Sequence, residues 1–252
     1  MKTLLIARRE FVMGWRTPLS WTLVGLFSLL TGWMFFNLLA GWVDNIAKLP
    51  PGAIGEASFL EEVILRLFGN IHFLLLFFAP PLTMRLLAEE RRQGTIDLLW
   101  AARASDAQVV VGKFLGAWAL LMCLMLPTLL YPVILFWAGI PDLAVVASCY
   151  AGLALAAACY VALGTFASAL TENQVVAALL GFVFVMFSWM MSWVAQSVDN
   201  YWFSEVLHYL SVSAHFEAFT RGAPATYDVV YFAGLAGLSL YAGAKALQSR
   251  NW

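Results

Sequence analysis

The sequence predicts an all-α polytopic membrane protein with six transmembrane helices in one domain, residues 1–252. Of its 252 residues, 62 % are hydrophobic and only 12 % are charged, whereas soluble domains carry about 25 % charge and 45–50 % apolar residues. The mean hydropathy of +0.81 agrees with this contrast. The formal net charge of −1 argues against a basic nucleic-acid binder. A soluble enzyme is therefore excluded, and the lipid bilayer is the first expected partner.

Residues 1–16 precede the first span and are too charged to cross a membrane. On a helical wheel Leu4, Phe11 and Trp15 fall together, while the basic residues Lys2, Arg9 and Arg16 fall about 140° away. This pattern predicts a helix that lies in the membrane interface with its basic side toward anionic headgroups. A simple topogenic charge cluster is the alternative.

Six runs are long and apolar enough to cross the hydrocarbon core, which takes roughly 20 residues. Pro80 and Pro81 interrupt the second run, which ends at Arg85. A polar hairpin of four residues, 171–174, separates the fourth run from the fifth. The predicted spans are about 19–43, 68–88, 114–138, 143–170, 175–195 and 229–247.

The segment between the second and third spans has several helix signals. Residues 85–93 are strong helix formers, which predicts that the second span continues beyond the membrane. Gly94 is a suitable terminator, and Thr95 can cap a short helix over about 95–103. Ser105 and Gln108 form a capping box that would start the third span's helix. The short helix carries Ile96, Leu98, Leu99 and Trp100, which need cover from lipid or from a groove on another protein.

Lysine and arginine predict the orientation of the chain. If both termini are cytoplasmic, only three of the 14 basic residues fall outside, namely Lys48, Arg66 and Arg221. The sequence therefore predicts a multi-pass protein of the bacterial cytoplasmic (inner) membrane with both termini in the cytoplasm.

No pattern predicts a catalytic, metal or cofactor site in this chain. The central turns of the six spans contain no ionisable residue, which argues against a proton-coupled carrier. His72, His208 and His215 are scattered in or beside outer loops without metal spacing, and His72 faces nothing more than headgroups in this interpretation. Gly112 and Lys113 do not complete a phosphate loop, because Ala107 and Phe114 occupy the other motif positions.

Pairs of small residues at i, i+4 occur in the fourth and sixth spans, a spacing that lets helices approach closely. We expect them to pack within the chain's own bundle rather than at a subunit interface. The pairs are Gly152/Ala156, Gly164/Ser168 and Ala233/Gly237.

The outer loop 196–228 is rich in aromatic residues, among them Trp202 and Phe216. Two short amphipathic helices at the outer leaflet fit this density, and an ordinary aromatic belt fits it equally well. The loop 44–66 is the natural place for an extracytoplasmic protein partner.

Three separated blocks resemble type 2 ABC transporter permeases, and most closely their gliding-motility-type branch. The first is Arg8-Arg9-Glu10-Phe11 before Thr17-Pro18. The second combines Met84-Arg85, Ala88-Glu89-Glu90-Arg91, Gly94-Thr95-Ile96-Asp97-Leu98-Leu99 and Gly112-Lys113-Phe114. The third includes Ala214-His215-Phe216 and Phe219-Thr220-Arg221-Gly222. The loop positions Ala102–Ala104 and Ala223–Thr226 depart from the family pattern.

The resemblance implies an N-terminal elbow helix containing Arg8, Arg9, Glu10 and Phe11, and a coupling segment, 89–104, that docks on a separate ATP-binding subunit. Its coupling residues would be Glu89, Glu90, Gly94, Thr95, Ile96, Asp97, Leu98 and Leu99. The outer-loop residues singled out are Trp202, His215, Phe216 and Arg221. ATP and Mg would be bound by two copies of the partner ATPase, and a second permease copy or a related membrane subunit would complete the complex. The alternative function is an ATPase-coupled mechanical scaffold of an envelope or gliding machine that moves no small substrate.

Overall fold

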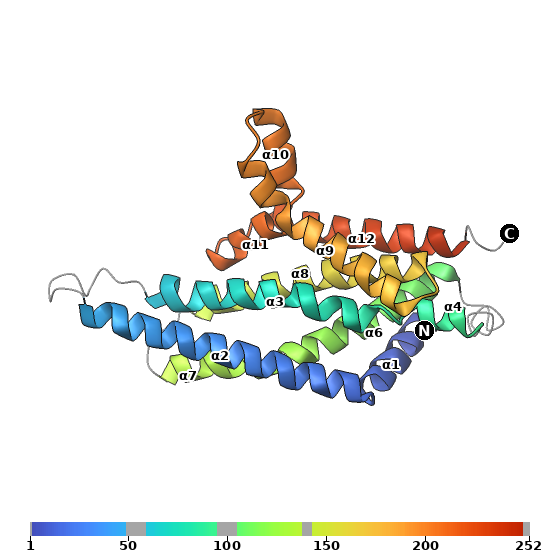
Figure 1. The fold of residues 1–252 in the computed structure, drawn as a ribbon, viewed down its shortest axis with the longest axis horizontal. Coiled ribbons are helices and arrows are strands. Elements are labelled where there is room, and N and C mark those ends of the chain that lie inside the picture. The colour runs from blue at the N-terminus through green and yellow to red at the C-terminus, as the bar shows by residue number, and fades with distance from the viewer. Residues whose placement is uncertain (1, 49–58, 95–104, 138–142, 249–252) are drawn as a thin grey trace.

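The computed structural model describes residues 2–48, 59–94, 105–137 and 143–248, and these residues are helical with short connections and no strand (Figure 1). The long helices run side by side, and the helix α1, Lys2–Trp15, lies inclined to them at one end of the bundle. The remaining elements are α2 Pro18–Lys48, π-helical η2 Leu60–Leu65, α3 Arg66–Thr83, α4 Ala88–Arg92, α6 Asp106–Met125, 3₁₀-helical η3 Leu126–Leu129, α7 Leu130–Trp137, α8 Leu143–Leu170, α9 Gln174–Gln196, α10 Tyr201–Tyr209, α11 Val212–Thr220 and α12 Thr226–Gln248.

Six helical segments are long and apolar enough to cross a membrane, which confirms the predicted fold class. They are Pro18–Lys48, Glu62–Arg92, Asp106–Phe136, Leu143–Leu170, Gln174–Gln196 and Thr226–Gln248. Chain direction alternates between them, so α1, α4 and the last turn of α12 lie at the same end (Figure 1). We call this the α1 end of the bundle.

The helix α8 forms the centre of the bundle and packs against α3, α6, α9, α11 and α12. Its small residues allow these neighbours to come close. A Cβ at Gly152 would lie 2.6 Å from the Cβ of Phe219, and Gly164 lies directly against Thr83. The first two pairs of small residues therefore pack within the chain, as expected. The third pair does not, because Ala233 and Gly237 are exposed on α12.

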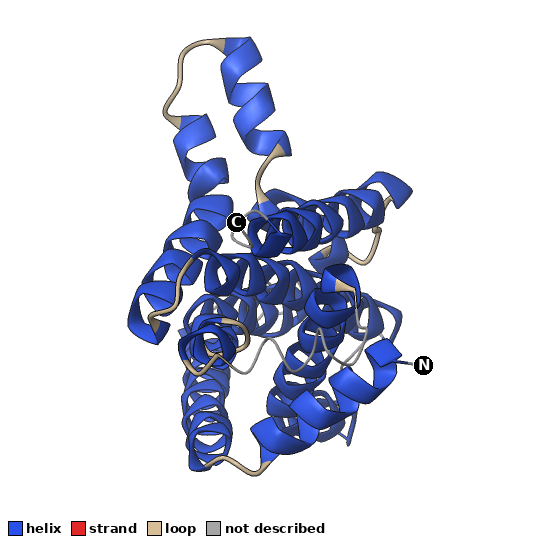
Figure 2. Ribbon diagram, turned by 90° about the vertical axis from the view of Figure 1, so that its right-hand side faces the viewer, coloured by secondary structure: helices blue, strands red, loops and turns tan. Residues whose placement is uncertain are grey.

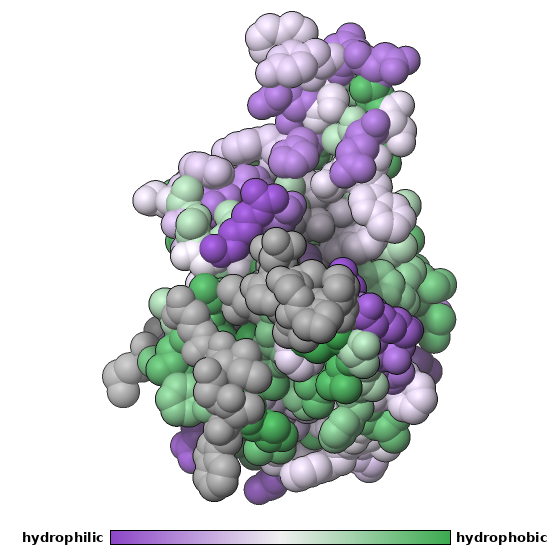
Figure 3. All heavy atoms as spheres, turned by 90° about the vertical axis from the view of Figure 1, so that its left-hand side faces the viewer, coloured by the Kyte–Doolittle hydropathy of each residue, from purple (hydrophilic) through white to green (hydrophobic). Residues whose placement is uncertain are grey.

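The outward faces of α2, α9 and α12 carry exposed apolar side chains such as Leu29, Phe187 and Leu238. Apolar surface of this extent suits helices that face lipid. Viewed along the bundle, α10 and its neighbouring segments stand clear of the long helices (Figure 2). From the end opposite the α1 end, hydrophilic residues and residues of intermediate hydropathy cover most of this projection, whereas hydrophobic residues are more frequent in the bundle below it (Figure 3).

The helix propensity of residues 85–93 predicts that the second span continues as one α-helix. The structure shows a break instead. The helix α3 passes through Pro80 and Pro81 and ends at Thr83, and a turn at 84–87 separates it from α4. The hydroxyl of Ser168 on α8 accepts hydrogen bonds from the backbone N–H groups of Leu87 (3.1 Å) and Ala88 (3.0 Å). A side chain of another helix therefore takes donors that a continuous helix would use internally.

Candidate functional site

Four charged side chains from three helices meet at the α1 end, and we call them the charge cluster: Arg9 and Glu10 of α1, Glu90 of α4 and Lys113 of α6. The Nζ atom of Lys113 lies 2.9 Å from Oε1 of Glu10 and 2.9 Å from Oε1 of Glu90. Nη2 of Arg9 lies 3.1 Å from the same Glu90 oxygen. The Lys113 side chain is only 2 % exposed. A lysine buried to this degree requires paired carboxylates, which the cluster provides.

The cluster depends on a close approach between α1 and α6. A Cβ at Gly112 would lie 2.9 Å from the carbonyl oxygen of Thr3, and one at Gly116 would lie 2.8 Å from that of Ala7. These two glycines, four residues apart, leave room for the backbone of α1 directly on α6. Glu10 consequently reaches Lys113 over a separation of 103 residues.

The helix α4 is held in place by α8 as well as by the charge cluster. The Ser168 hydroxyl that receives the N–H groups of Leu87 and Ala88 also donates to the carbonyl of Met84 at 3.0 Å. Nη1 of Arg91 donates to the carbonyl of Ala169 at 2.5 Å. The helix ends at Arg92, and Gly94, which follows the C-cap residue Gln93, has a φ of +66°, the left-handed conformation predicted for a terminator.

The predicted coupling residues are only partly within the described structure. Glu90 belongs to the charge cluster, and Glu89 accepts a hydrogen bond from the side chain of Gln93. Gly94 ends α4, whereas Thr95, Ile96, Asp97, Leu98 and Leu99 lie outside the described residues. The helix α6 begins at the predicted capping box, since the Ser105 side chain receives Gln108 N–H and the Gln108 side chain receives Ser105 N–H.

The predicted elbow residues lie in the helix α1. Thr3, Ile6, Ala7 and Glu10 contact α6, and Leu4 of the apolar stripe is 68 % exposed. Phe11 stacks with Trp15 at 6.3 Å between ring centroids, and Arg8 is exposed. The glycines of α6 therefore lie against backbone carbonyls of α1 and against the side chains of Ile6 and Glu10.

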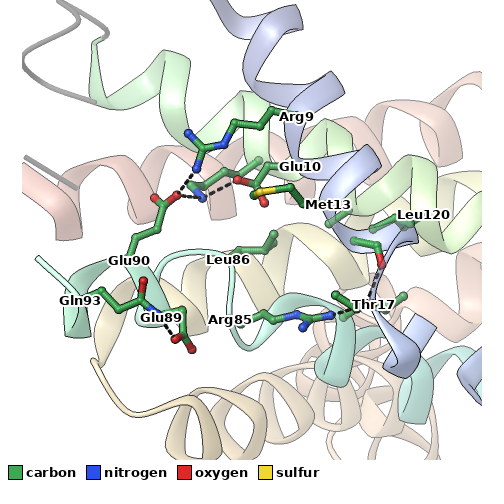
Figure 4. A pocket seen from close by; sticks show the side chains of 14 residues that line it. Arg9, Glu10, Met13, Thr17, Arg85, Leu86, Glu89, Glu90, Gln93 and Leu120 are labelled. Carbon is green, nitrogen blue, oxygen red and sulfur yellow. Dashed lines mark hydrogen bonds and ion pairs between the residues drawn. The ribbon is translucent and has the colours of Figure 1, made fainter. Parts of the chain in front are cut away.

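A cavity of about 650 Å³ opens beside the charge cluster, between α1, the α3–α4 turn and α6 (Figure 4). One part of its wall is the charge cluster. Another part is Arg85, whose Nη2 donates to the Thr17 hydroxyl at 3.0 Å. The wall between them is apolar and includes Met13, Leu86 and Leu120.

At the opposite end of the bundle, the predicted outer-loop residues have different surroundings. His215 is buried, with Nδ1 2.7 Å from Oδ1 of Asp228 and Nε2 2.9 Å from the carbonyl oxygen of Tyr209. Phe216 is buried against the ring of His72, whereas Trp202 and Arg221 are exposed. Arg221 pairs with Glu217 one turn earlier in α11. His215 thus fastens α11 to α12.

The interpretation of His72 as a residue facing headgroups is wrong. His72 lies within the spanning helix α3, is 2 % exposed, and shares a 2.7 Å hydrogen bond between its Nε2 and the hydroxyl of Tyr160 on α8. Its ring stacks on Phe216 at 4.2 Å. A polar pair of this kind is tolerated in a bundle core because each group satisfies the other. Among the described residues, no group of three His, Cys, Asp or Glu side chains is placed to hold a metal ion.

Sequence reasoning missed Lys113 and its two flanking glycines as parts of a site. The signal for them is Gly112-x-x-x-Gly116, the same spacing of small residues as in α8, with a lysine inside it. The partners of Lys113 are 23 and 103 residues away, so no local pattern identifies them.

The helical bundle with six candidate spans defines the chain as a polytopic membrane protein. A family model described as "ABC-2 family transporter protein" matches residues 55–242. The chain therefore belongs to the ABC-2 transporter family and is a transporter permease component, a membrane part that is not itself catalytic. A comparison with curated proteins found no match.

Proposed function

We propose that the chain is the permease subunit of an ATP-driven ABC exporter, and that a separate ATPase subunit drives it through α4 and the segment that follows Gly94. The observation that carries this proposal is the charge cluster. The segment 94–104 leaves α4 and leads into α6, and the contact between Glu90 and Lys113 ties together the helices on its two sides. A push on this segment would therefore reach α4 and α6 together.

Two further contacts extend this path into the bundle. Glu10 connects Lys113 to α1, and Ser168 connects the start of α4 to the central helix α8. Charge-assisted contacts between largely buried groups are short and directional, so they resist separation better than exposed pairs do. Glu89, Glu90 and the 94–99 segment would thus transmit force rather than perform chemistry.

The orientation that this function requires places the α1 end in the cytoplasm of a bacterial cell, under the inner membrane. Its support is the distribution of lysine and arginine, which are concentrated before α2 and around α4. Two ATPase copies, with bound ATP and Mg, and a second permease copy or a related subunit would complete the transporter. The resemblance of the three sequence blocks supports placing the chain in the gliding-motility-type branch of this family.

Co-purification with candidate ATPases tests the docking assignment. We expect deletion of 94–100 to abolish the complex, because it removes the predicted docking segment. Deletion of 49–55, a segment of equal length that follows α2 in the sequence, is the matched control and should leave the complex intact. A complex that survives loss of 94–100 would refute the assignment.

A second function, the mechanical scaffold, is favoured by the projection formed by α10. Its side chains Tyr201 and Trp202 are 71 % and 78 % exposed, a surface that suits contact with another protein or with lipid. ATPase activity in liposomes separates the two functions. Stimulation by a small or lipidic substrate supports export, whereas stimulation only by a protein added at the outer face supports the scaffold.

A further inference from the structure

We propose that the cavity between α1, the α3–α4 turn and α6 binds the phosphate headgroup of an anionic phospholipid through Arg85. This site is additional to the force path, and it rests on the proposed orientation only in the choice of an inner-leaflet lipid. Its volume of about 650 Å³ is in the range of small-molecule sites, roughly 300–1,000 Å³.

The charge of the cavity wall is balanced everywhere except at Arg85 and Glu89. Arg9, Glu10, Glu90 and Lys113 neutralise one another within the charge cluster. Arg85 forms no ion pair with any described residue, and the hydroxyl of Thr17 is its hydrogen-bond partner. Its side chain extends toward Thr17, whereas Glu89 faces Gln93 on the α4 side of the cavity (Figure 4). The guanidinium group therefore retains donors for an anion, and its planar fork matches a phosphate.

The position of Arg85 along the bundle is that of a lipid headgroup. Thr17 immediately precedes α2, which begins at Pro18, and Arg85 follows closely on α3, which ends at Thr83. Both partners thus stand near the α1 end of two candidate spans, Pro18–Lys48 and Glu62–Arg92. Long basic side chains at such positions place their charge among the headgroups.

The rest of the wall favours an amphiphile over a free anion. Met13, Leu86 and Leu120 form an apolar surface between Arg85 and the charge cluster. Met13 is 45 % exposed at the outward side of α1, next to the exposed Val12. An acyl chain could therefore leave the cavity along α1 toward the bilayer while its phosphate stays on Arg85.

Binding of a short-chain phosphatidylglycerol to the purified full-length chain in a neutral detergent tests the proposal. We expect Arg85→Gln to weaken binding about tenfold, the loss of one charge-assisted contact. Arg8→Gln is the matched control, because Arg8 is an exposed arginine of α1 that does not line the cavity. Met13→Trp, which keeps Arg85 but narrows the cavity, should also weaken binding, and it keeps the test valid if Arg85→Gln does not fold.

Inorganic phosphate separates the two sources of the anion. We expect millimolar phosphate to compete poorly with the lipid, whereas equal competition would mean a free-anion site and would overturn the lipid assignment. Equal lipid affinity of the wild type and Arg85→Gln would overturn the role of Arg85. If the chain alone shows no Arg85-dependent lipid binding but Arg85→Gln weakens the ATPase complex, the cavity belongs to a protein partner and the proposal is wrong. The ATPase is absent from the binding measurement, so its result is independent of the docking test.

Discussion

Lys113 contributes most to the stability of the α1 end, because it is buried and pairs with two carboxylates from two other helices. A buried charge loses its hydration, and its stability comes from the groups that replace the water. The exposed pair Lys48–Asp44, whose side chains are 69 % and 67 % exposed, shows the opposite case. Surface pairs of that kind contribute little, about 0–1 kcal/mol.

We expect Lys113→Met to destabilise the protein by about 3–5 kcal/mol, because it leaves Glu10 without its cation and Glu90 with Arg9 as the only cation of the charge cluster. Unfolding in mixed micelles, followed by circular dichroism, measures the change. Lys48→Met is the control and should change stability by less than about 1 kcal/mol. Equal effects of the two substitutions would show that the charge cluster is not a structural centre.

Ser168 has a comparable role for the backbone at the start of α4. Its hydroxyl contacts two N–H groups and one carbonyl, so Ser168→Ala leaves buried backbone groups unsatisfied, at a cost of about 1–3 kcal/mol. Ser188→Ala is the matched control, because the Ser188 hydroxyl bonds only to Val185 of its own helix. We expect thermal unfolding to report a lower midpoint for Ser168→Ala alone. A normal midpoint would mean that the α3–α4 turn does not need this hydroxyl.

Among the elements, α1 shows how a helix contact depends on residues distant in the sequence. Its amphipathic pattern predicts a helix in the membrane interface and gives no sign of the contact with α6, which Thr3, Ile6, Ala7 and Glu10 make. The contact between α1 and α6 depends on the close approach of the two backbones. Replacing a glycine of α6 by alanine tests this directly.

We expect Gly112→Ala and Gly116→Ala to lower stability by about 1–3 kcal/mol each, because a Cβ at either position meets backbone atoms of α1 that cannot move alone. Gly41→Ala is the control, since a Cβ there meets nothing within 4 Å. Maleimide labelling of a cysteine at Ala7 should accelerate in the two α6 variants, as α1 moves away from α6. Unchanged labelling would contradict this arrangement of α1.

The sequence predicts correctly those elements that depend on residues close to one another in the chain. The six spans, the capping box at Ser105 and the terminator Gly94 each depend on residues within a few positions of one another. The break after Thr83 depends instead on Ser168, more than 80 residues away, and helix propensity alone gives no sign of it. The charge cluster cannot be predicted from local sequence either, because its members are far apart in the chain. The family resemblance includes Glu10 and Glu90 but does not pair them with Lys113.

At the scale of the whole molecule, buried polar contacts join helices at both ends of the bundle. The charge cluster joins three helices at the α1 end, and His215–Asp228 and His72–Tyr160 fasten α11, α12, α3 and α8 toward the other end. Of the three histidines expected in or beside outer loops, His72 and His215 belong to the core, whereas His208 is exposed. A force applied at one end would therefore act on a bundle whose helices are joined by polar contacts at both ends.

The orientation of this bundle is open to a labelling experiment in a background without Cys123, Cys149 and Cys159. A cysteine at Tyr201, exposed on α10, should react with an impermeant maleimide in cells with a permeable outer envelope and an intact inner membrane. A cysteine at Arg92, exposed on α4, should react only after the inner membrane is opened. The reverse pattern would place the α1 end outside the cell.

The most direct test of the account is an electron-paramagnetic-resonance distance between spin labels at Arg92 on α4 and Tyr227 at the start of α12, in the complex with the ATPase. If ATP-driven movement enters through α4 and spreads into the bundle, vanadate trapping should shift this distance. The Lys113→Met variant should reduce the shift, because its charge cluster is broken. A distance that stays unchanged on trapping, in a complex that hydrolyses ATP, would contradict force transmission through the α1 end.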